Sequence, residues 1–461
     1  MTHVHTAHVD AAPIHAAKAL TRDGWRSDVR LHIQAGRIVE LQIGVPPQPG
    51  DDRQAIIVPA LANVHSHAFQ RGMAGLTERR GPSADDFWSW RDVMYRFALS
   101  MSPEQVEAVA CQAYVEMLEA GFCRVGEFHY LHHDVSGQPY RDLGEMAGRI
   151  ASAAATTGIG LTLLPVFYAH ASFGGTPPGE NQRRFVNTVD GYARLLERCR
   201  AAVAILHTAV VGVAPHSLRA VTPEELAAVT GMAGAAPVHI HIAEQVKEVQ
   251  DCLAWSRRRP VQWLFEHADV DGRWCLVHAT HLEDAEQASI ARSGAIAGLC
   301  PVTEANLGDG IFDAAGYLSQ GGRFGIGTDS NVRVGVADEL CLLEYSQRLA
   351  HRARNVLGNA ECSTGRVLLE RALQGGAAAL GVDAADLSAG APADIVSLDA
   401  YHPSLVCKDD DALVDAWIFS AGSAAIDCVW VGGKRVVERG RHVLRDEIRA
   451  KFAGTMKTLL G

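Results

Sequence analysis

Two histidines, His65 and His67, flank a serine in the stretch LANVHSHAFQRGM. They follow the apolar run IIVPALANV, which has the composition of a buried strand. Alternate residues of a strand point to the same side, so the two imidazoles could bind one metal ion together. A second pair, His3 and His5, has the same spacing but lies in the polar start MTHVHTAHVD. We interpret the first pair as a candidate metal site and the second as part of a frayed terminus.

Further polar residues that could act with this pair lie where other apolar stretches end. Neutral imidazoles combined with a carboxylate form a ligand set that suits zinc or iron. In VHIHIAEQ, His239 and His241 point to the same side of the strand, so the alternation of side chains cannot show which of them is the metal ligand. His241 is nearer to the strand end, and we prefer it as the ligand. The polar residues at the predicted strand ends are Glu127, His129 and Tyr130; His216 and Ser217; His239, His241 and Glu244; His278; and Thr328, Asp329 and Ser330.

The order of the predicted elements explains how these residues could meet. In the middle of the chain, helical patterns alternate with short apolar stretches typical of buried strands. One helix, SPEQVEAVACQAYVEMLEAG, has Ser102 as its predicted cap and Pro103 at its first position, and it ends at Gly121. Eight such strands predict an α/β fold in which parallel strands close into a (β/α)8 TIM-like barrel. Functional residues of such barrels lie at the C-terminal ends of the strands, where these polar residues fall.

The two ends of the chain have a different pattern. The segment DVRLHIQAGRIVELQIG alternates apolar and polar residues around a predicted turn at Ala35-Gly36. Near the other end, ADIVSLDA and AIDCVWVGGKRVVERGRHV look similar, with a hairpin turn at Gly432-Gly433. We therefore expect both ends to build one small β-sandwich. The predicted domains are the N-terminal part of the sandwich (1–57), the barrel (58–385) and the C-terminal part of the sandwich (386–461).

The bulk composition narrows the class of protein. The chain has 461 residues, of which 48% are hydrophobic and 21% charged, as in soluble globular proteins. Its net charge of -11 disfavours nucleic acid and anionic membranes as partners. The ten cysteines are scattered without a CxxC pair, which favours a reduced, cytoplasmic protein. The sequence shows neither a signal peptide nor an apolar run long enough for a membrane span.

Taken together, the strand-end residues resemble the amidohydrolase superfamily, and the resemblance covers nearly the whole chain. The stretch GAPADIVSLD near the C-terminal end is also similar to this family. Members with two metals keep a bridging lysine at the end of strand four, where this chain has His216. The HxxE spacing from His241 to Glu244 resembles the one-metal deaminase branch, which includes cytosine, guanine and adenosyl-homocysteine deaminases. The family pattern of strands one, five, six and eight falls on His65, His67, His241, His278 and Asp329.

A narrower resemblance is carried by NVHSHAFQRGMAGLTE, followed by DFWSWRDVMY, and by EFHYLHH, APHSLRAV and HIHIAEQ. These motifs resemble those of the N-formimino-L-glutamate deiminases of histidine degradation. The resemblance implies metal-dependent hydrolysis of a C=N bond, which converts N-formimino-L-glutamate and water to N-formyl-L-glutamate and ammonia. It also implies a homodimer and one divalent metal per chain, with Zn²⁺ favoured over Fe²⁺. The implied metal ligands are His65, His67, His241 and Asp329.

The resemblance also implies roles in catalysis. A divalent ion lowers the pKa of a bound water from about 15.7 to roughly 7, so hydroxide is available at neutral pH. Asp329 and His278 would take the proton and orient the hydroxide, and which of the two accepts the proton is left open. Glu244 would carry a proton to the departing nitrogen.

Substrate binding is expected to depend on arginines, because a glutamyl group carries two carboxylates and the guanidinium fork matches them. The matched motifs contain Arg91 within WSWRDV and Arg219 within HSLR. Gln70, Tyr130 and His216 lie in the other matched stretches and would add hydrogen bonds. The expected partner is therefore a small molecule with carboxylates.

Two other interpretations stay open at this point. A one-metal deaminase of a heterocycle, such as guanine, a pterin or an adenosyl compound, would favour aromatic stacking partners and fewer arginines. A non-catalytic relative that serves as a scaffold would be expected to lose metal ligands, whereas here every position of the pattern is filled.

Overall fold

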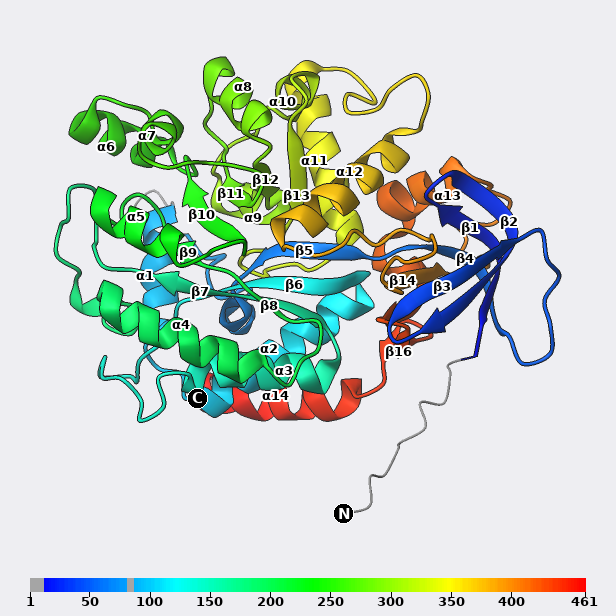
Figure 1. Ribbon diagram of the computed structural model, residues 1–461, viewed down its shortest axis with the longest axis horizontal. Helices are drawn as coiled ribbons and strands as arrows, with labels where there is room; N and C mark the ends of the chain where they lie inside the picture. The colour runs from blue at the N-terminus through cyan, green and yellow to red at the C-terminus, as the bar shows by residue number, and fades with distance from the viewer. Residues whose placement is uncertain (1–11, 81–86) are drawn as a thin grey trace, which may run out of the picture.

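The structure, a computed structural model, describes residues 12–80 and 87–461. The pair His3 and His5 lies outside the described residues, so its interpretation stays a prediction. Figure 1 shows strands surrounded by helices and, beside them, a smaller sheet built from both ends of the chain. Within the described residues, no helix is both long and apolar enough to cross a membrane.

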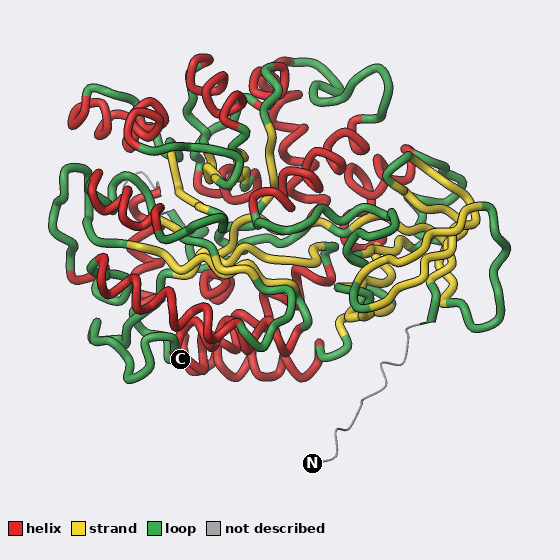
Figure 2. The backbone as a smooth tube through the Cα atoms, in the orientation of Figure 1, coloured by secondary structure: helices red, strands yellow, loops and turns green. Residues whose placement is uncertain are grey.

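The predicted (β/α)8 barrel is confirmed, because each of the eight expected stretches contributes a parallel strand in the described part of the chain. Apart from the first residue of the last strand and the short fourth strand, the residues of these strands are buried, as expected where helices cover a parallel sheet. Figure 2 shows this arrangement, with helices around the central strands. The strands are β5 (Leu61–Ser66), β6 (Phe122–His129), β7 (Gly160–Phe167), β8 (Val210–Val211) with β9 (Ala214–Pro215), β10 (Val238–Ile242), β11 (Trp274–His278), β12 (Ile296–Leu299) and β13 (Arg323–Ile326).

Two seams close the barrel. Continuous ladders join β5 to β8 and β10 to β13, and bridges at Val213–Val238 and Ser66–Asp329 connect the two halves. Gly327 makes the second seam possible, because a Cβ at this position would lie 2.9 Å from backbone atoms of His65. The first and last strands therefore meet at the C-terminal edge of the barrel.

The helices cover the barrel, and their ends follow ordinary capping rules. The predicted cap is confirmed: Ser102 accepts the Gln105 N–H at 3.3 Å, and Pro103 is the first residue of α2. The helices are α1 (Phe87–Ala98), α2 (Pro103–Glu119), α3 (Glu145–Thr157), α4 (Val189–Val203), α5 (Pro223–Gly231), α6 (Val246–Ser256), α7 (Pro260–His267), α8 (Asp284–Ser293), α9 (Pro301–Leu307), α10 (Ala314–Ser319), α11 (Val336–His351), α12 (Thr364–Ala379), α13 (Asp411–Ala416) and α14 (Arg445–Leu460).

The smaller sheet confirms that both ends of the chain form one β structure. Its order in the described residues is β17-β16-β15-β14-β4-β1-β2-β3, and β4 joins the two ends by pairing with β1 and β14. Apolar residues from both ends, such as Ile14, Ile57 and Trp430, form its own core. The strands are β1 (Ile14–Thr21), β2 (Gly24–Gln34), β3 (Arg37–Ile43), β4 (Asp52–Pro59), β14 (Ile395–Leu398), β15 (Ile426–Val431), β16 (Lys434–Glu438) and β17 (Arg441–His442).

Two details differ from the sequence analysis. The run IIVPALANV, predicted as one barrel strand, is divided: Val58 pairs with Val396 in the small sheet, and Leu61 pairs with Phe122 in the barrel. Because nearly every residue of the run is apolar and buried, its pattern could not show that its partners change. The chain also ends in a helix, α14, which was not predicted and which packs against α2.

Candidate active site

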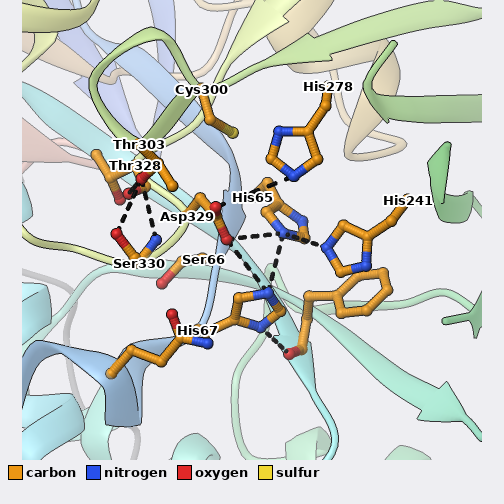
Figure 3. A network of polar contacts seen from close by, with 12 residues as sticks. His65, Ser66, His67, His241, His278, Cys300, Thr303, Thr328, Asp329 and Ser330 are labelled. Atoms are coloured by element: carbon orange, nitrogen blue, oxygen red, sulfur yellow. Dashed lines mark hydrogen bonds and ion pairs between the residues drawn. The ribbon is translucent and has the colours of Figure 1, made fainter. Parts of the chain in front are cut away.

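The four predicted metal ligands lie together at the C-terminal edge of the barrel, as Figure 3 shows. The Nε2 atom of His65 lies 3.2 Å from that of His67 and 3.0 Å from that of His241. Oδ1 of Asp329 lies 3.4 Å from His65 and 3.3 Å from His67. Donors around a tetrahedral ion with bonds of about 2.0–2.2 Å lie roughly 3.3–3.6 Å apart. The cluster therefore has the dimensions of a metal site.

The hydrogen bonds of these imidazoles support the same conclusion. Nδ1 of His67 donates to the Phe128 carbonyl at 2.9 Å, and Nδ1 of His241 donates to the His216 carbonyl at 3.1 Å. Each bond places the proton on Nδ1 and leaves a lone pair on Nε2. Burial lowers the pKa of His65 to about 3, which keeps this imidazole neutral as well. Lone pairs that converge beside a carboxylate fit a bound cation.

The seam between the first and last barrel strands positions the ligands. The backbone N–H of Asp329 donates to the His65 carbonyl at 2.9 Å, and the N–H of His67 donates to the Asp329 carbonyl at 3.0 Å. Asp329 has a φ of 45°, in the left-handed region that side chains rarely adopt. Such backbone strain persists only where its surroundings hold it, and it is concentrated at functional sites.

The structure resolves which histidine of β10 joins the cluster. His241 does so, as predicted, whereas Nε2 of His239 bonds the carbonyl oxygen of Ala379 at 2.7 Å. Both side chains are on the same face, but two residues along a strand are separated by roughly 6.6 Å. His239 therefore lies deeper in the barrel and has a structural partner.

Glu244 and His278 adjoin the cluster. Nε2 of His278 lies 3.7 Å from Oε1 of Glu244 and 4.0 Å from Oδ2 of Asp329. Burial raises the pKa of Glu244 to about 7, although His278 and Arg219 oppose this shift. Burial lowers the pKa of His278, but Glu244, Glu304 and Asp329 together raise it to about 10. Two groups that can hold protons near neutral pH thus lie beside the four ligands.

All five predicted substrate-binding residues line one cavity together with His67, His241, Glu244, His278 and Asp329. Gln70 lies in a short 3-10 helix, Ala68–Met73, and donates to the Tyr130 hydroxyl at 2.9 Å. Arg91 comes from α1, and its guanidinium carbon lies 4.4 Å from the centre of the Trp88 ring. Nη2 of Arg219 lies 3.9 Å from Oε2 of Glu244.

Three buried polar atoms of the cavity residues have no hydrogen-bond partner among the described residues. They are Nη1 of Arg219, Nε of Arg91 and Oε1 of Gln70. A buried N–H group without a hydrogen-bond acceptor is costly, so guanidinium N–H groups of residues that line a cavity favour an anionic ligand that can accept from them. This part of the cavity is suited to bind carboxylates.

Several residues near the site were not predicted. Tyr168 lines the cavity, and its hydroxyl accepts a hydrogen bond from Gln182 at 2.5 Å. Glu304 contacts His278, and Asp309 lies close to Glu244 and His278. Tyr168 lies in the strand-like stretch LTLLPVFYAH and directly follows β7, so its place at a strand end was a signal that could have been used. Glu304 lies in the short helix α9 and Asp309 in the loop after it, where no periodic pattern singles them out.

The barrel, the histidine and aspartate cluster and the small β domain together define a class of protein. The chain belongs to the amidohydrolase family, whose model matches residues 56–436. Residues 12–55 match a model described as the N-terminal domain of formimidoylglutamate deiminase HutF. The chain is 50% identical over 451 residues to the formimidoylglutamate deiminase of Pseudomonas aeruginosa, with 97% of this chain and 99% of that protein covered. The predicted family is confirmed.

Two further relatives place the chain within this family. A crystal structure of an amidohydrolase from Brucella melitensis is 58% identical and superposes with a TM-score of 0.95, covering 98% of this chain and 100% of that one. The 5-methylthioadenosine/S-adenosylhomocysteine deaminase of Natronomonas pharaonis is 26% identical, over 88% of this chain and 86% of that protein. Similarity to the formimidoylglutamate deiminase is thus much higher than to this purine-type deaminase.

Proposed function

We propose that this chain hydrolyses N-formimino-L-glutamate, which is the same compound as formimidoylglutamate, to N-formyl-L-glutamate and ammonia in histidine degradation. One observation carries the proposal: Arg91 and Arg219, each with a buried guanidinium N–H that has no partner among the described residues, line the same cavity as His67, His241 and Asp329 of the ligand cluster. The 50% identity to a formimidoylglutamate deiminase over nearly the whole chain supports it.

The metal part of the proposal is one divalent ion per chain, with Zn²⁺ favoured because three imidazoles and one carboxylate suit it. His65, His67, His241 and Asp329 would hold the ion. When bound, such an ion polarises water and lowers its pKa toward neutrality. The chain's own residues then bind the substrate, orient it and move protons.

The substrate's orientation follows from the charges in the cavity. Arg219 is the arginine adjacent to Glu244, so we assign it the α-carboxylate, which is the carboxylate nearer to the formimino carbon. Arg91, on α1, is assigned the more distant γ-carboxylate. Gln70, Tyr130 and His216 line the cavity between these groups and add hydrogen bonds. The formimino carbon is thereby directed toward Glu244, His278 and Asp329.

Proton transfer is assigned to the acidic groups and the imidazole around that carbon. Hydrolysis moves two protons from water to the departing nitrogen and leaves one oxygen on carbon. Asp329 and His278, 4.0 Å apart, would take a proton from the attacking water, and Glu244, 3.7 Å from His278, would deliver a proton to the nitrogen. Its raised pKa, about 7, suits an acid that works near neutral pH.

The main alternative is deamination of a heterocycle, and aromatic residues such as Trp90, Tyr95 and Phe185 do line the cavity. The discriminating experiment measures ammonia release from formiminoglutamate, guanine, cytosine and adenosyl-homocysteine side by side. Formiminoglutamate should have the highest kcat/KM, by about a hundredfold or more. If kcat/KM were higher for guanine, we would abandon the dicarboxylate substrate but still conclude that the chain is a metal-dependent deaminase. The expected homodimer and cytoplasmic location stay predictions.

A further inference from the structure

We propose that Glu304 is a positioning residue that fixes the direction of the His278 imidazole. The inference rests on the proposed hydrolysis, because His278 is one of the groups that face the reacting carbon. Oε1 of Glu304 lies 3.3 Å from Nδ1 of His278, and both side chains are buried, with exposed fractions of 4% and 1%. A carboxylate that accepts from Nδ1–H holds the ring in the orientation that directs Nε2 toward Glu244 and Asp329.

Glu304 is itself held firmly. It lies in the first turn of α9, a helix that begins with Pro301 directly after β12. The same Oε1 atom accepts the backbone N–H of Cys300 at 2.8 Å, and the Glu304 carbonyl accepts the N–H of Asp309 at 2.9 Å. In Figure 3, the Cys300 side chain lies next to the His278 ring, which places the start of α9 beside this imidazole. The carboxylate is therefore supported by backbone and has little freedom to move.

The backbone of His278 explains why such support is needed. His278 has a φ of 68° and Ala279 a φ of 49°, both in the left-handed region. The N–H of Ala279 bonds the carbonyl of Ile242 at 3.1 Å and so ties this turn to β10. Strained backbone of this kind persists where its surroundings over-determine it. The turn sets the position of the ring, and Glu304 sets its rotation.

The charged groups around His278 divide into two sides. Glu244 and Asp329 face Nε2, at 3.7 Å and 4.0 Å, whereas Glu304 contacts Nδ1. The other titratable residues near His278 are Cys300, Asp309, His65 and His241. Among the described residues, Glu304 is the carboxylate bonded to Nδ1, so its loss would free the ring to rotate.

The test compares Glu304→Gln with a matched control, Glu339→Gln. Glu339 is also fully buried and accepts a backbone N–H, that of Val302 at 2.9 Å, but it contacts α9 rather than His278. Glutamine keeps the shape and a neutral acceptor in both variants, but at position 304 it removes the negative charge that strengthens the bond to Nδ1. We expect Glu304→Gln to lower kcat roughly 10- to 100-fold, the size typical for partners that orient functional imidazoles. KM should change less than about threefold, with full metal content, whereas Glu339→Gln should keep kcat within threefold.

A double-mutant cycle with His278→Asn separates positioning from general damage. If Glu304 acts through His278, adding Glu304→Gln to His278→Asn should change kcat less than about twofold. Multiplicative losses would overturn the inference, as would a Glu304→Gln kcat within threefold of the wild type, or equal losses in both glutamine variants. Each ratio of variant to wild-type kcat is measured with whichever substrate the wild-type enzyme converts fastest. The test of Glu304 therefore does not depend on whether that substrate is formiminoglutamate.

Discussion

The two ends of the cavity are built differently. At one end, His67 and His241 are each fixed by a backbone carbonyl, and Asp329 is part of the seam that closes the barrel. At the other end, Arg91 and Arg219 come from a helix and from a loop after β9, and each retains a buried N–H group without a partner in the described part of the chain. The first end therefore presents converging ligand atoms that suit a cation, and the second presents guanidinium N–H groups that suit an anion.

This difference indicates how the tasks are divided. Strands and their backbone hydrogen bonds are the most rigid parts of a barrel, and they hold the groups that need the most accurate geometry. Loops and a helix at the rim hold the groups that select the substrate. Changes at the first end should therefore abolish the reaction, whereas changes at the second should alter which molecule reacts.

The largest effect is expected for His65→Ala. Removal of this donor leaves the cluster with three ligands, so metal content and activity should be lost together, the latter by roughly a thousandfold or more. Metal analysis and ammonia release from the same preparation provide the measurement. Retention of one equivalent of metal in this variant would contradict the assigned ligand set.

The chain offers a matched control on the same strand as another ligand. His239→Ala removes a buried imidazole two residues before His241 but no ligand, and it leaves the Ala379 carbonyl without its hydrogen bond. This variant should keep its metal while losing about 1–3 kcal/mol of unfolding free energy. If the His239→Ala variant lost its metal, the deeper position of His239 in the barrel would not exclude it from metal binding, in contrast to our assignment of His241 alone.

The next effect in size concerns the acid between the two ends. Glu244→Gln preserves shape but cannot carry a proton, so kcat should fall by about 10²–10⁴ while metal content and the melting temperature stay unchanged. Single-turnover and steady-state ammonia release would measure it. A rate within a few-fold of the wild type would remove Glu244 from the mechanism.

The smallest effects are expected at the arginines, and they concern selectivity. Charge-assisted hydrogen bonds contribute roughly 1.5–3 kcal/mol, so Arg219→Met and Arg91→Met should each lower kcat/KM for formiminoglutamate by about one to two decades. Metal content should not change. Arg71→Met is the control, because Arg71 is paired with Glu116 at 2.5 Å and does not line the cavity.

Analogues that lack one carboxylate sharpen this test. An analogue with an amide in place of the α-carboxylate should be a poor substrate for the wild type, but its kcat/KM should fall little further in Arg219→Met. The γ-amide should behave in the same way with Arg91→Met. If both arginine variants retained wild-type kcat/KM on formiminoglutamate, the second end would not bind carboxylates.

Most of the barrel and the ligand end could be predicted from sequence, because both depend on local patterns. His65 and His67 follow a buried strand at the spacing of one pleat, and Asp329 follows the glycine that permits close packing of β13 on β5. Strand parity could not choose between His239 and His241. The choice depends on depth in the barrel, which is a property of the assembled structure.

The residues that escaped prediction depend on contacts between segments distant in sequence. Glu304 functions through a contact with His278, 26 residues away, from a short helix with weak periodicity. The division of IIVPALANV between two sheets is decided by its partners, Val396 and Phe122, and by no feature of the run itself. The cavity's arginines were found through motif resemblance, since their spacing alone does not distinguish them from surface residues.

The seam at Ser66 and Asp329 also bears on how a newly synthesised chain matures. Three of the four ligand residues have been synthesised once β10 is complete, but the carboxylate and the backbone bonds that orient it belong to the segment that follows the last barrel strand. A nascent chain that stops before Asp329 has an open barrel and an incomplete set of ligands. The full set of four ligand atoms therefore exists only once the last barrel strand is in place, which couples metal binding to completion of the barrel.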